Sequence, residues 1–193
     1  MKCDMGGAAA VAGAIHACAL NEVPLHIIGL IPATDNQLGP DSYGPGDVIT
    51  MYDGTRVEVM NTDAEGRLVM ADALAYAKQY HPSLVMDLAT LTGSSMRAIG
   101  NYAAAAMGTA DEKTKKTLIN AGFASHERLV EFPLWDDYET DLHSDIADTR
   151  NLGPTPMADV IIAGKFLQKF TDYPWMHIDI AGPAFLTSAR GYL

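Results

Sequence analysis

The strongest candidate for chemistry is a short polar segment, residues 61–67, with the sequence Asn-Thr-Asp-Ala-Glu-Gly-Arg. Asp63 and Glu65 are two positions apart, a spacing that places both carboxylates on one side of an extended backbone. Arg67 lies two positions further and can project near the same place, while Gly66 allows a tight turn beside a ligand. Paired carboxylates are typical ligands of hard divalent cations. The segment therefore predicts a metal site.

A purely structural interpretation of the same residues stays open. Thr62 and Glu65 have the spacing of a capping box, which would start the apolar helix expected from Leu68. Asp4 is equally ambiguous, because a carboxylate just ahead of a helix suits the positive end of that helix. As a third metal ligand, however, Asp4 would give the site enough negative charge for two divalent cations, a hydroxide and a substrate. That combination is the charge pattern of a two-metal hydrolase.

The hydrophobic pattern predicts the elements that must position these groups. Residues 6–20 are almost all small and predict a buried helix, and the apolar run at 25–31 is typical of a strand covered on both faces. A hairpin is expected over 48–59. Further strands are expected at 84–89, 103–108 and 175–181, and helices at 68–78, 112–128, 135–148 and 158–170. This alternation predicts an α/β fold with a mixed, mostly parallel sheet and helices on both faces.

Ligands of open α/β sheets bind beyond the carboxyl ends of the strands. Three polar segments are candidates for that edge, namely residues 1–4, 61–67 and 90–93. Asp87 and Asp179 lie inside apolar strands and need partners there, so we interpret them as hydrogen-bonding anchors, with support of a ligand site as the alternative. The histidines in apolar surroundings (His16, His26 and His177) are interpreted as core residues rather than ligands.

Composition excludes several classes of protein. The chain has 193 residues, of which 48% are hydrophobic and 19% charged, as in a globular domain rather than a disordered or fibrous one. The net charge of −11 argues against nucleic acid as a partner. No apolar run reaches the roughly 18 residues that span a membrane, and no serine-hydrolase or phosphate-loop motif is present. Two cysteines, and the polar Asp4 and His16 around the apolar N-terminal run, favour a cytoplasmic protein over a secreted one.

Five motifs along the chain occur together in a recognisable order. Residues 61–68 read Asn-Thr-Asp-Ala-Glu-Gly-Arg-Leu, and residues 1–7 have the pattern M-x-x-D-M-x-G. Pro-Gly-Asp-Val stands at 45–48, Ala-Thr-Leu-Thr-Gly at 89–93 and His-Ile-Asp-Ile-Ala-Gly at 177–182. With this order and spacing, nearly the whole chain resembles the leucyl aminopeptidase family, also called the cytosol aminopeptidases or peptidase family M17.

The resemblance implies a metal-dependent aminopeptidase that removes N-terminal, leucine-like residues from peptides with a free N-terminus by two-metal hydrolysis. The two divalent ions would be Zn²⁺ or Mn²⁺, with Mg²⁺ or Co²⁺ as alternatives. Asp4, Asp63 and Glu65 would be metal ligands, with Glu65 bridging both ions, and Arg67 would hold a bicarbonate that acts as general base. The substrate-binding residues would be Met1, Thr90, Leu91, Gly93, Ala181 and Ala184.

The resemblance also implies that residues 1–193 are part of a C-terminal catalytic domain, incomplete at both ends and without the N-terminal domain. In the family, motifs upstream supply a lysine and an aspartate as metal ligands and a second lysine that stabilises the oxyanion. The loop at 34–44 departs from the family pattern, which usually has a glycine and a basic residue there. Full-length members form hexamers, so we expect a homo-oligomer without membrane contact. The alternative function is a catalytically incomplete fragment that serves only as an assembly or binding module.

Overall fold

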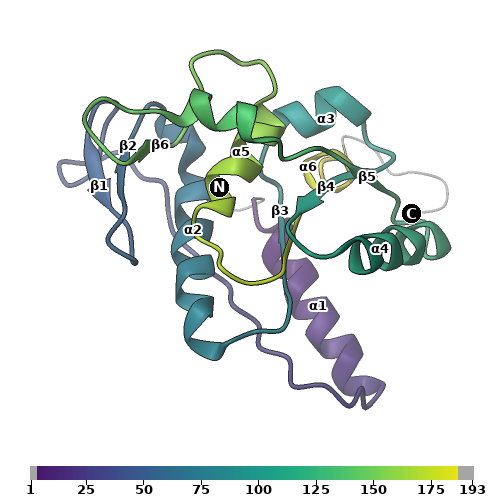
Figure 1. The fold of residues 1–193 in the computed structure, drawn as a ribbon. Helices are drawn as coiled ribbons and strands as arrows, with labels where there is room; N and C mark the ends of the chain where they lie inside the picture. Colours follow the sequence, from purple (N-terminus) through teal and green to yellow (C-terminus); the bar gives the residue numbers. More distant parts are fainter. Residues whose placement is uncertain (1–3, 187–193) are drawn as a thin grey trace.

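The structure is a computed structural model that describes residues 4–186 (Figure 1). The α-helices are α1 (Gly6–Leu20), α2 (Glu65–Ala77), α3 (Gly93–Ile99), α4 (Glu112–Ala124), α5 (Asp159–Gln168) and α6 (Ala181–Ala184). Short 3₁₀ helices are η1 (Thr62–Ala64), η2 (Lys78–Tyr80) and η3 (Asp136–Leu142). The strands are β1 (Val48–Thr50), β2 (Arg56–Glu58), β3 (Val85–Ala89), β4 (Ala104–Gly108), β5 (Leu129–Glu131), β6 (Thr149–Arg150) and β7 (Trp175–Asp179).

The central sheet has four strands in the order β3-β7-β4-β5. β3 pairs in parallel with β7, and β4 pairs in parallel with β5, whereas β4 and β7 are antiparallel. The sheet is therefore mixed and mostly parallel, as the sequence predicts. β7 is buried along its whole length, because it has a neighbour on each side and apolar layers above and below.

Helices cover both faces of this sheet, which confirms the predicted α/β fold. Alternate side chains of β4 point to opposite faces. Ala104 and Ala106 pack in a cluster with Leu118 and Ile119 of α4, on one face. On the other face, Ala105 and Met107 pack in a cluster with residues of α5, namely Val160 and Ile161.

A second, three-stranded sheet lies beside α2, at the left in Figure 1. β1 and β2 form the predicted antiparallel hairpin, and its turn uses Gly54 at a φ of 91°, a backbone conformation that favours glycine. β6 joins β2 in parallel. Val57 and Val59 are fully buried in one cluster with α2 and α5, so this small sheet shares the main hydrophobic core.

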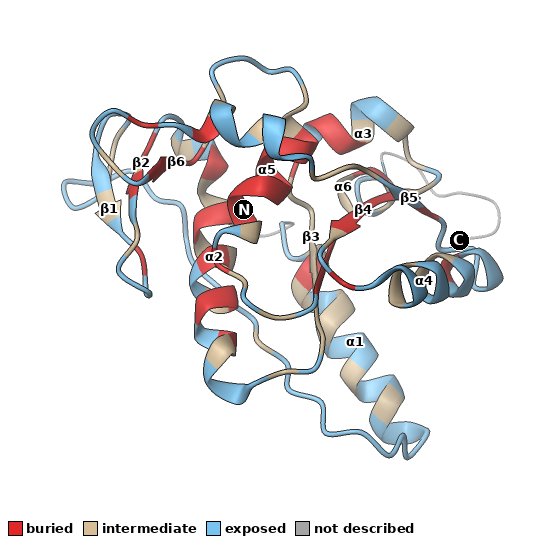
Figure 2. Cartoon of the chain, in the orientation of Figure 1, coloured by how far each residue is buried: buried red, intermediate tan, exposed pale blue. Residues whose placement is uncertain are grey.

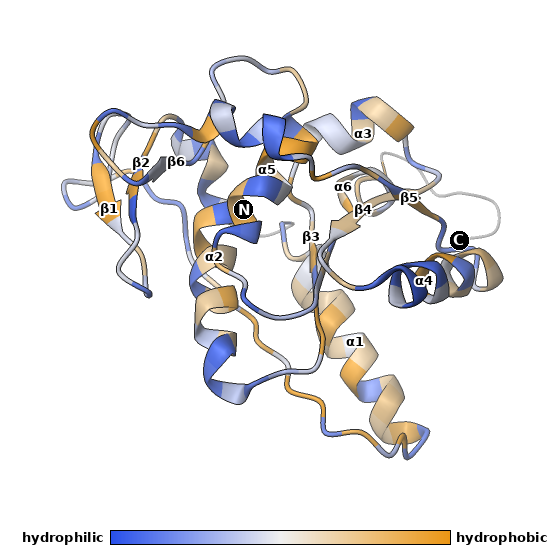
Figure 3. Cartoon of the chain, viewed as in Figure 1, coloured by the Kyte–Doolittle hydropathy of each residue, from blue (hydrophilic) through white to orange (hydrophobic). Residues whose placement is uncertain are grey.

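The N-terminal region is where the sequence-based expectations are wrong. α1 forms at the predicted residues, but only Gly7 of this helix is buried. The apolar run at 25–31 is not a strand, and Leu25, Ile27, Ile28 and Ile31 are exposed. Figures 2 and 3 show the result, a helix and its following segment that are both hydrophobic and solvent-exposed. Hydrophobicity indicated a covered strand, but a strand also needs a hydrogen-bonding partner, and residues 4–186 supply none to this segment.

Within residues 4–186, no helix is both long enough and apolar enough to cross a membrane.

Candidate functional site

The candidate site forms where β3 and β7 end. Asp179, the last residue of β7, is fully buried and accepts hydrogen bonds from the backbone N–H groups of Leu91, Thr92 and Ala181 at 3.0–3.1 Å. The Thr92 hydroxyl donates to the same carboxylate at 2.7 Å. The interpretation of Asp179 as an anchor is confirmed. It fixes the 90–93 segment and the start of α6 side by side, which brings Leu91 and Ala181 to one edge of the sheet.

Asp4 reaches the same edge from the N-terminal side. Thr90 Oγ1 donates a hydrogen bond to Asp4 Oδ1 at 2.5 Å. The alternative that Asp4 caps a helix is wrong, because Met5 is the N-cap residue of α1 and no side chain of the described residues caps that end. A Cβ placed on Gly6 would lie 3.1 Å from Thr90 Cγ2 and 3.6 Å from Ala184 Cβ, so the start of α1 fits closely between these two predicted substrate residues.

The 61–67 segment approaches this edge from the other side, since a Cβ on Gly66 would lie 3.3 Å from Leu91 Cδ1. The capping-box interpretation is wrong. The Asn61 side chain caps η1 by accepting a hydrogen bond from Asp63 N at 2.9 Å, and within residues 4–186 no side chain caps α2. Asp4, the 90–93 segment and the 61–67 segment therefore meet at one sheet edge. Met1, which we expected in the substrate pocket, lies outside the described residues.

Glu65 is the side chain whose environment points most directly to a cation. Its Oε2 atom is buried and has no hydrogen-bond partner among residues 4–186. A carboxylate oxygen buried without a donor is unfavourable, and a bound cation would satisfy it. Across residues 4–186, however, no three His, Cys, Asp or Glu side chains come together in a group that could hold a metal ion. Glu65 thus fits a metal, but the structure does not assemble Asp4, Asp63 and Glu65 into a ligand set.

Arg67 is held in place by two partners. The side chain lies in the first turn of α2 and is buried. Its Nη1 donates to the carbonyl oxygen of Asn151 at 3.0 Å, and its Nη2 donates to Asp159 Oδ1 at 3.1 Å. Its Nε is buried and has no partner among the described residues. The guanidinium is therefore already paired with a carboxylate of the same chain.

Asn151 organises the segment that carries the predicted ligands. It is fully buried, and its side-chain oxygen accepts from Met60 N at 2.7 Å. Its side-chain NH₂ group donates to the carbonyl oxygens of Asn61 at 2.9 Å and Ala64 at 3.4 Å. The side-chain amide of Asn151 thus binds both ends of η1, and the backbone carbonyl oxygen of Asn151 accepts from Arg67.

A cavity of about 1090 Å³ lies between the 34–45 loop and α2. Glu65, Leu68 and Asp72 line its α2 side, whereas Arg67 does not line it. Burial raises the pKa of Tyr43, and the nearby Glu65 carboxylate raises it further, so Tyr43 of the loop lies within electrostatic reach of Glu65. The loop that departs from the family pattern therefore forms one wall beside the candidate metal ligand.

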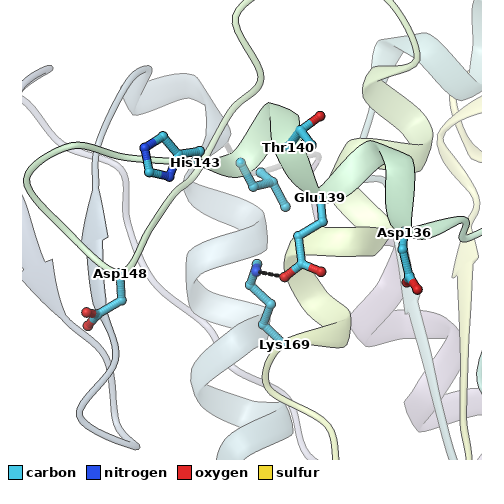
Figure 4. A pocket seen from close by; sticks show the side chains of 7 residues that line it. Asp136, Glu139, Thr140, His143, Asp148 and Lys169 are labelled. Carbon is cyan, nitrogen blue, oxygen red and sulfur yellow. Dashed lines mark hydrogen bonds and ion pairs between the residues drawn. The ribbon is translucent and has the colours of Figure 1, made fainter.

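Another cavity, of about 640 Å³, lies between η3 and the end of α5 (Figure 4). Its lining includes the ion pair in which Lys169 Nζ donates to Glu139 Oε1 at 2.5 Å. None of its lining residues belongs to the three polar segments, so we do not assign it to the candidate site.

Asp87 is also an anchor, as expected. Its Oδ2 accepts from Trp175 Nε1, and its Oδ1 pairs with Nδ1 of the fully buried His177, both at 2.5 Å. Burial alone would lower the pKa of His177, but the negative charges of Asp87 and Asp179 prevail and raise its pKa above the ordinary value of 6.5. His177 is confirmed as a core residue, although its Nε2 has no partner within residues 4–186.

The raised pKa of His177 predicts a pH dependence of stability. Because the folded protein binds this proton more tightly than the unfolded chain, the stabilisation is complete below pH 6.5 and is lost as pH rises through the folded-state pKa. We expect the free energy of unfolding in urea to fall over that range. In a His177→Gln variant this fall of the free energy of unfolding with pH should disappear. In His26→Gln, at an exposed position, it should remain. If the free energy of unfolding of His177→Gln depends on pH as in the unaltered chain, His177 is not the cause of this pH dependence.

Sequence reasoning did not find Asn151, Asp159 or Tyr43. Asn151 and Asp159 lie more than 80 residues from the Arg67 that they contact. The only available signal was Asp159 at the start of a predicted helix, where an acidic residue is common without any function.

Comparison with known proteins identifies the family of the chain. The family model described as "Cytosol aminopeptidase family, catalytic domain" matches residues 1–192. The chain is 52% identical over 188 residues to a probable cytosol aminopeptidase of Chlorobaculum tepidum, covering 96% of this chain and 37% of that protein. It is 48% identical over 193 residues to a probable cytosol aminopeptidase of Geobacter sulfurreducens, covering 100% of this chain and 38% of that protein. The chain thus spans well under half the length of these relatives. With a family match along almost its entire length, the chain belongs to the cytosol aminopeptidase family.

Proposed function

We propose that this chain is part of the catalytic domain of a dinuclear-metal aminopeptidase that removes leucine-like residues from the free N-termini of peptides. The observation that carries the proposal is the buried Oε2 of Glu65, which has no hydrogen-bond partner among residues 4–186 and belongs to the segment that reaches the sheet edge beside Asp4 and the 90–93 segment. The names of the relatives support the aminopeptidase activity.

In this proposal Asp4, Asp63 and Glu65 would supply carboxylate ligands to two divalent ions, Zn²⁺ or Mn²⁺ by preference and Mg²⁺ or Co²⁺ as alternatives. When bound, the ions supply Lewis acidity toward the peptide carbonyl and lower the pKa of an attacking water. Asp4 is oriented for this role by the hydrogen bond from Thr90. The set needs further ligands, because three carboxylates do not enclose two ions.

The substrate side of the proposal rests on small and apolar residues. Thr90, Leu91, Gly93, Ala181 and Ala184 border the first side chain of the peptide, and Asp179 keeps the 90–93 segment and α6 in register. Ala184 is exposed and lies close to the start of α1, so a side chain bound there would contact both helices.

Three further expectations concern the oligomeric state, the cellular location and bicarbonate. Homo-oligomerisation, as a hexamer of the full-length protein, is consistent with the exposed apolar surface of α1 and the 25–31 segment. We infer a cytoplasmic location, because the similar proteins are named cytosol aminopeptidases. Bicarbonate at Arg67 does not fit the arrangement, because the buried guanidinium already pairs with Asp159, so we assign no step to bicarbonate.

The metal site is tested by thermal unfolding of the chain after metal removal. We expect about 1 mM Mn²⁺ or Zn²⁺ to raise the melting temperature by about 3 °C, as for weak binding at roughly tenfold above Kd. Glu65→Gln should abolish the shift, because it removes the buried charge, whereas the exposed Glu127→Gln should retain it. No shift in the unaltered chain would refute the metal site.

Activity is measured with leucyl anilide, and N-acetyl-leucyl anilide is the control for the free amine. We expect hydrolysis of the first compound only, slow in this chain and dependent on metal and on Glu65. A metal-induced rise in the melting temperature without any hydrolysis would favour the alternative, a catalytically incomplete assembly or binding module.

A further inference from the structure

The ion pair between Arg67 and Asp159 is unusually enclosed for a pair at a sheet edge. The side chain of Arg67 is 4% exposed and that of Asp159 is 18% exposed. By contrast, the pair between Arg56 and Asp148 elsewhere in the chain has side chains that are 56% and 50% exposed. A pair removed from water is screened weakly, so the charge of Asp159 acts strongly on the guanidinium.

Asp159 is itself fixed by more than Arg67. Its Oδ2 accepts from the Ser94 hydroxyl at 3.2 Å, and that hydroxyl accepts from Arg97 Nη2 at 2.8 Å. Asp159 is also the first residue of the ten-residue helix α5, where the helix dipole favours a negative charge. The carboxylate is therefore positioned by α3 and α5 independently of any external ligand.

In the metal-free protein, an added anion at Arg67 would meet an unfavourable electrostatic environment. The pair is neutral as it stands, and a second anion would leave one uncompensated negative charge in a buried place. Glu65 lies two residues away in the same segment and adds negative charge. The buried Nε–H of Arg67, which has no partner among the described residues, can be satisfied by a neutral acceptor such as a water molecule.

We propose that Asp159 is the resident anion of Arg67 in this protein, and that its carboxylate takes the place that an external bicarbonate would otherwise occupy. Asp159 is then a positioning residue, since it orients the guanidinium and neutralises it without contacting the substrate. The relevance of this inference to catalysis rests on the proposed function. Its direct consequence is that the protein does not bind bicarbonate at Arg67.

The test measures melting temperature in sodium bicarbonate against sodium chloride of equal ionic strength, at about pH 8 and without metal. We expect no bicarbonate-specific shift in the unaltered chain. Asp159→Asn, which removes the charge but keeps the shape, should unfold at lower temperature and regain about 3 °C or more in roughly 50 mM bicarbonate. Asp148→Asn, which breaks the exposed arginine pair, should show no such recovery.

A bicarbonate-specific rise in the unaltered chain would overturn the proposal, and so would a folded Asp159→Asn variant that shows no recovery. If Asp159→Asn does not fold, calorimetric titration of the unaltered chain with bicarbonate still decides, because measurable binding overturns the proposal and no binding supports it. Neither readout needs peptide hydrolysis, so a failure here is distinguishable from a failure of the proposed aminopeptidase activity.

Discussion

Replacing Gly7 with alanine is expected to lower the free energy of unfolding by about 3 kcal/mol, the upper end of the usual cost of overpacking. Gly7 is where α1 crosses β3, and an added Cβ would overlap the carbonyl oxygen of Leu88 and lie 3.1 Å from Ala89 Cα. The obstructing atoms are strand backbone, which cannot rotate away as a side chain can. The start of α1 would have to move, and with it Asp4 and its hydrogen bond to Thr90.

Gly13→Ala is the matched control, because Gly13 lies in the same helix and a Cβ added there would meet no atom of the described residues within 4 Å. Here alanine should raise the free energy of unfolding by about 0.5–1 kcal/mol through its higher helix propensity. Urea unfolding should therefore show a lower free energy of unfolding for Gly7→Ala and a higher one for Gly13→Ala. Equal effects at Gly7 and Gly13 would show that α1 does not approach β3 as closely as the structure indicates.

The second large effect is expected for Asn151→Ala, which should lower the free energy of unfolding by about 2–4 kcal/mol, because one buried and two partly buried hydrogen bonds are lost. The change removes the partners of Met60 N and of the Asn61 and Ala64 carbonyls. Leaving a buried polar group without a partner costs about 1–3 kcal/mol, and part of this loss is recovered where water can enter. The 61–67 segment should become more mobile as a result.

The control for this variant is Asn120→Ala, at an exposed position of α4, where we expect a change within about 0.5 kcal/mol. Amide hydrogen exchange checks the local claim, since Asn151→Ala should accelerate exchange in residues 60–67 more than in β7. Uniform acceleration across the chain would mean that Asn151 stabilises the whole fold rather than this segment.

The central sheet and its helices were predictable because their signals are local. Continuous apolar runs predicted β4 and β7, and 3.6-residue periodicity predicted α2 and α5. The run at 25–31 carried a similar signal and gave no strand, since hydrophobicity reports a preference for burial but not whether a partner strand is available. The capping box failed for another reason: the Asn61 side chain, one residue earlier, accepts from Asp63 N and caps η1, so Thr62 lies inside a 3₁₀ helix rather than at an N-cap position.

By itself, the sequence determined the α/β class, the polar segments at the sheet edge, the anchoring roles of Asp87 and Asp179, and, through its motifs, the family. Only the tertiary structure decided which groups surround them. It left Glu65 Oε2 without a donor among the described residues, placed Asn151 under the 61–67 segment and paired Arg67 with Asp159. These contacts of Asn151 and Arg67 join residues more than 80 positions apart, and their partners are selected by how α2, α5 and the two sheets pack. Local spacing can propose a ligand, but only packing determines whether its charge is left free or already neutralised.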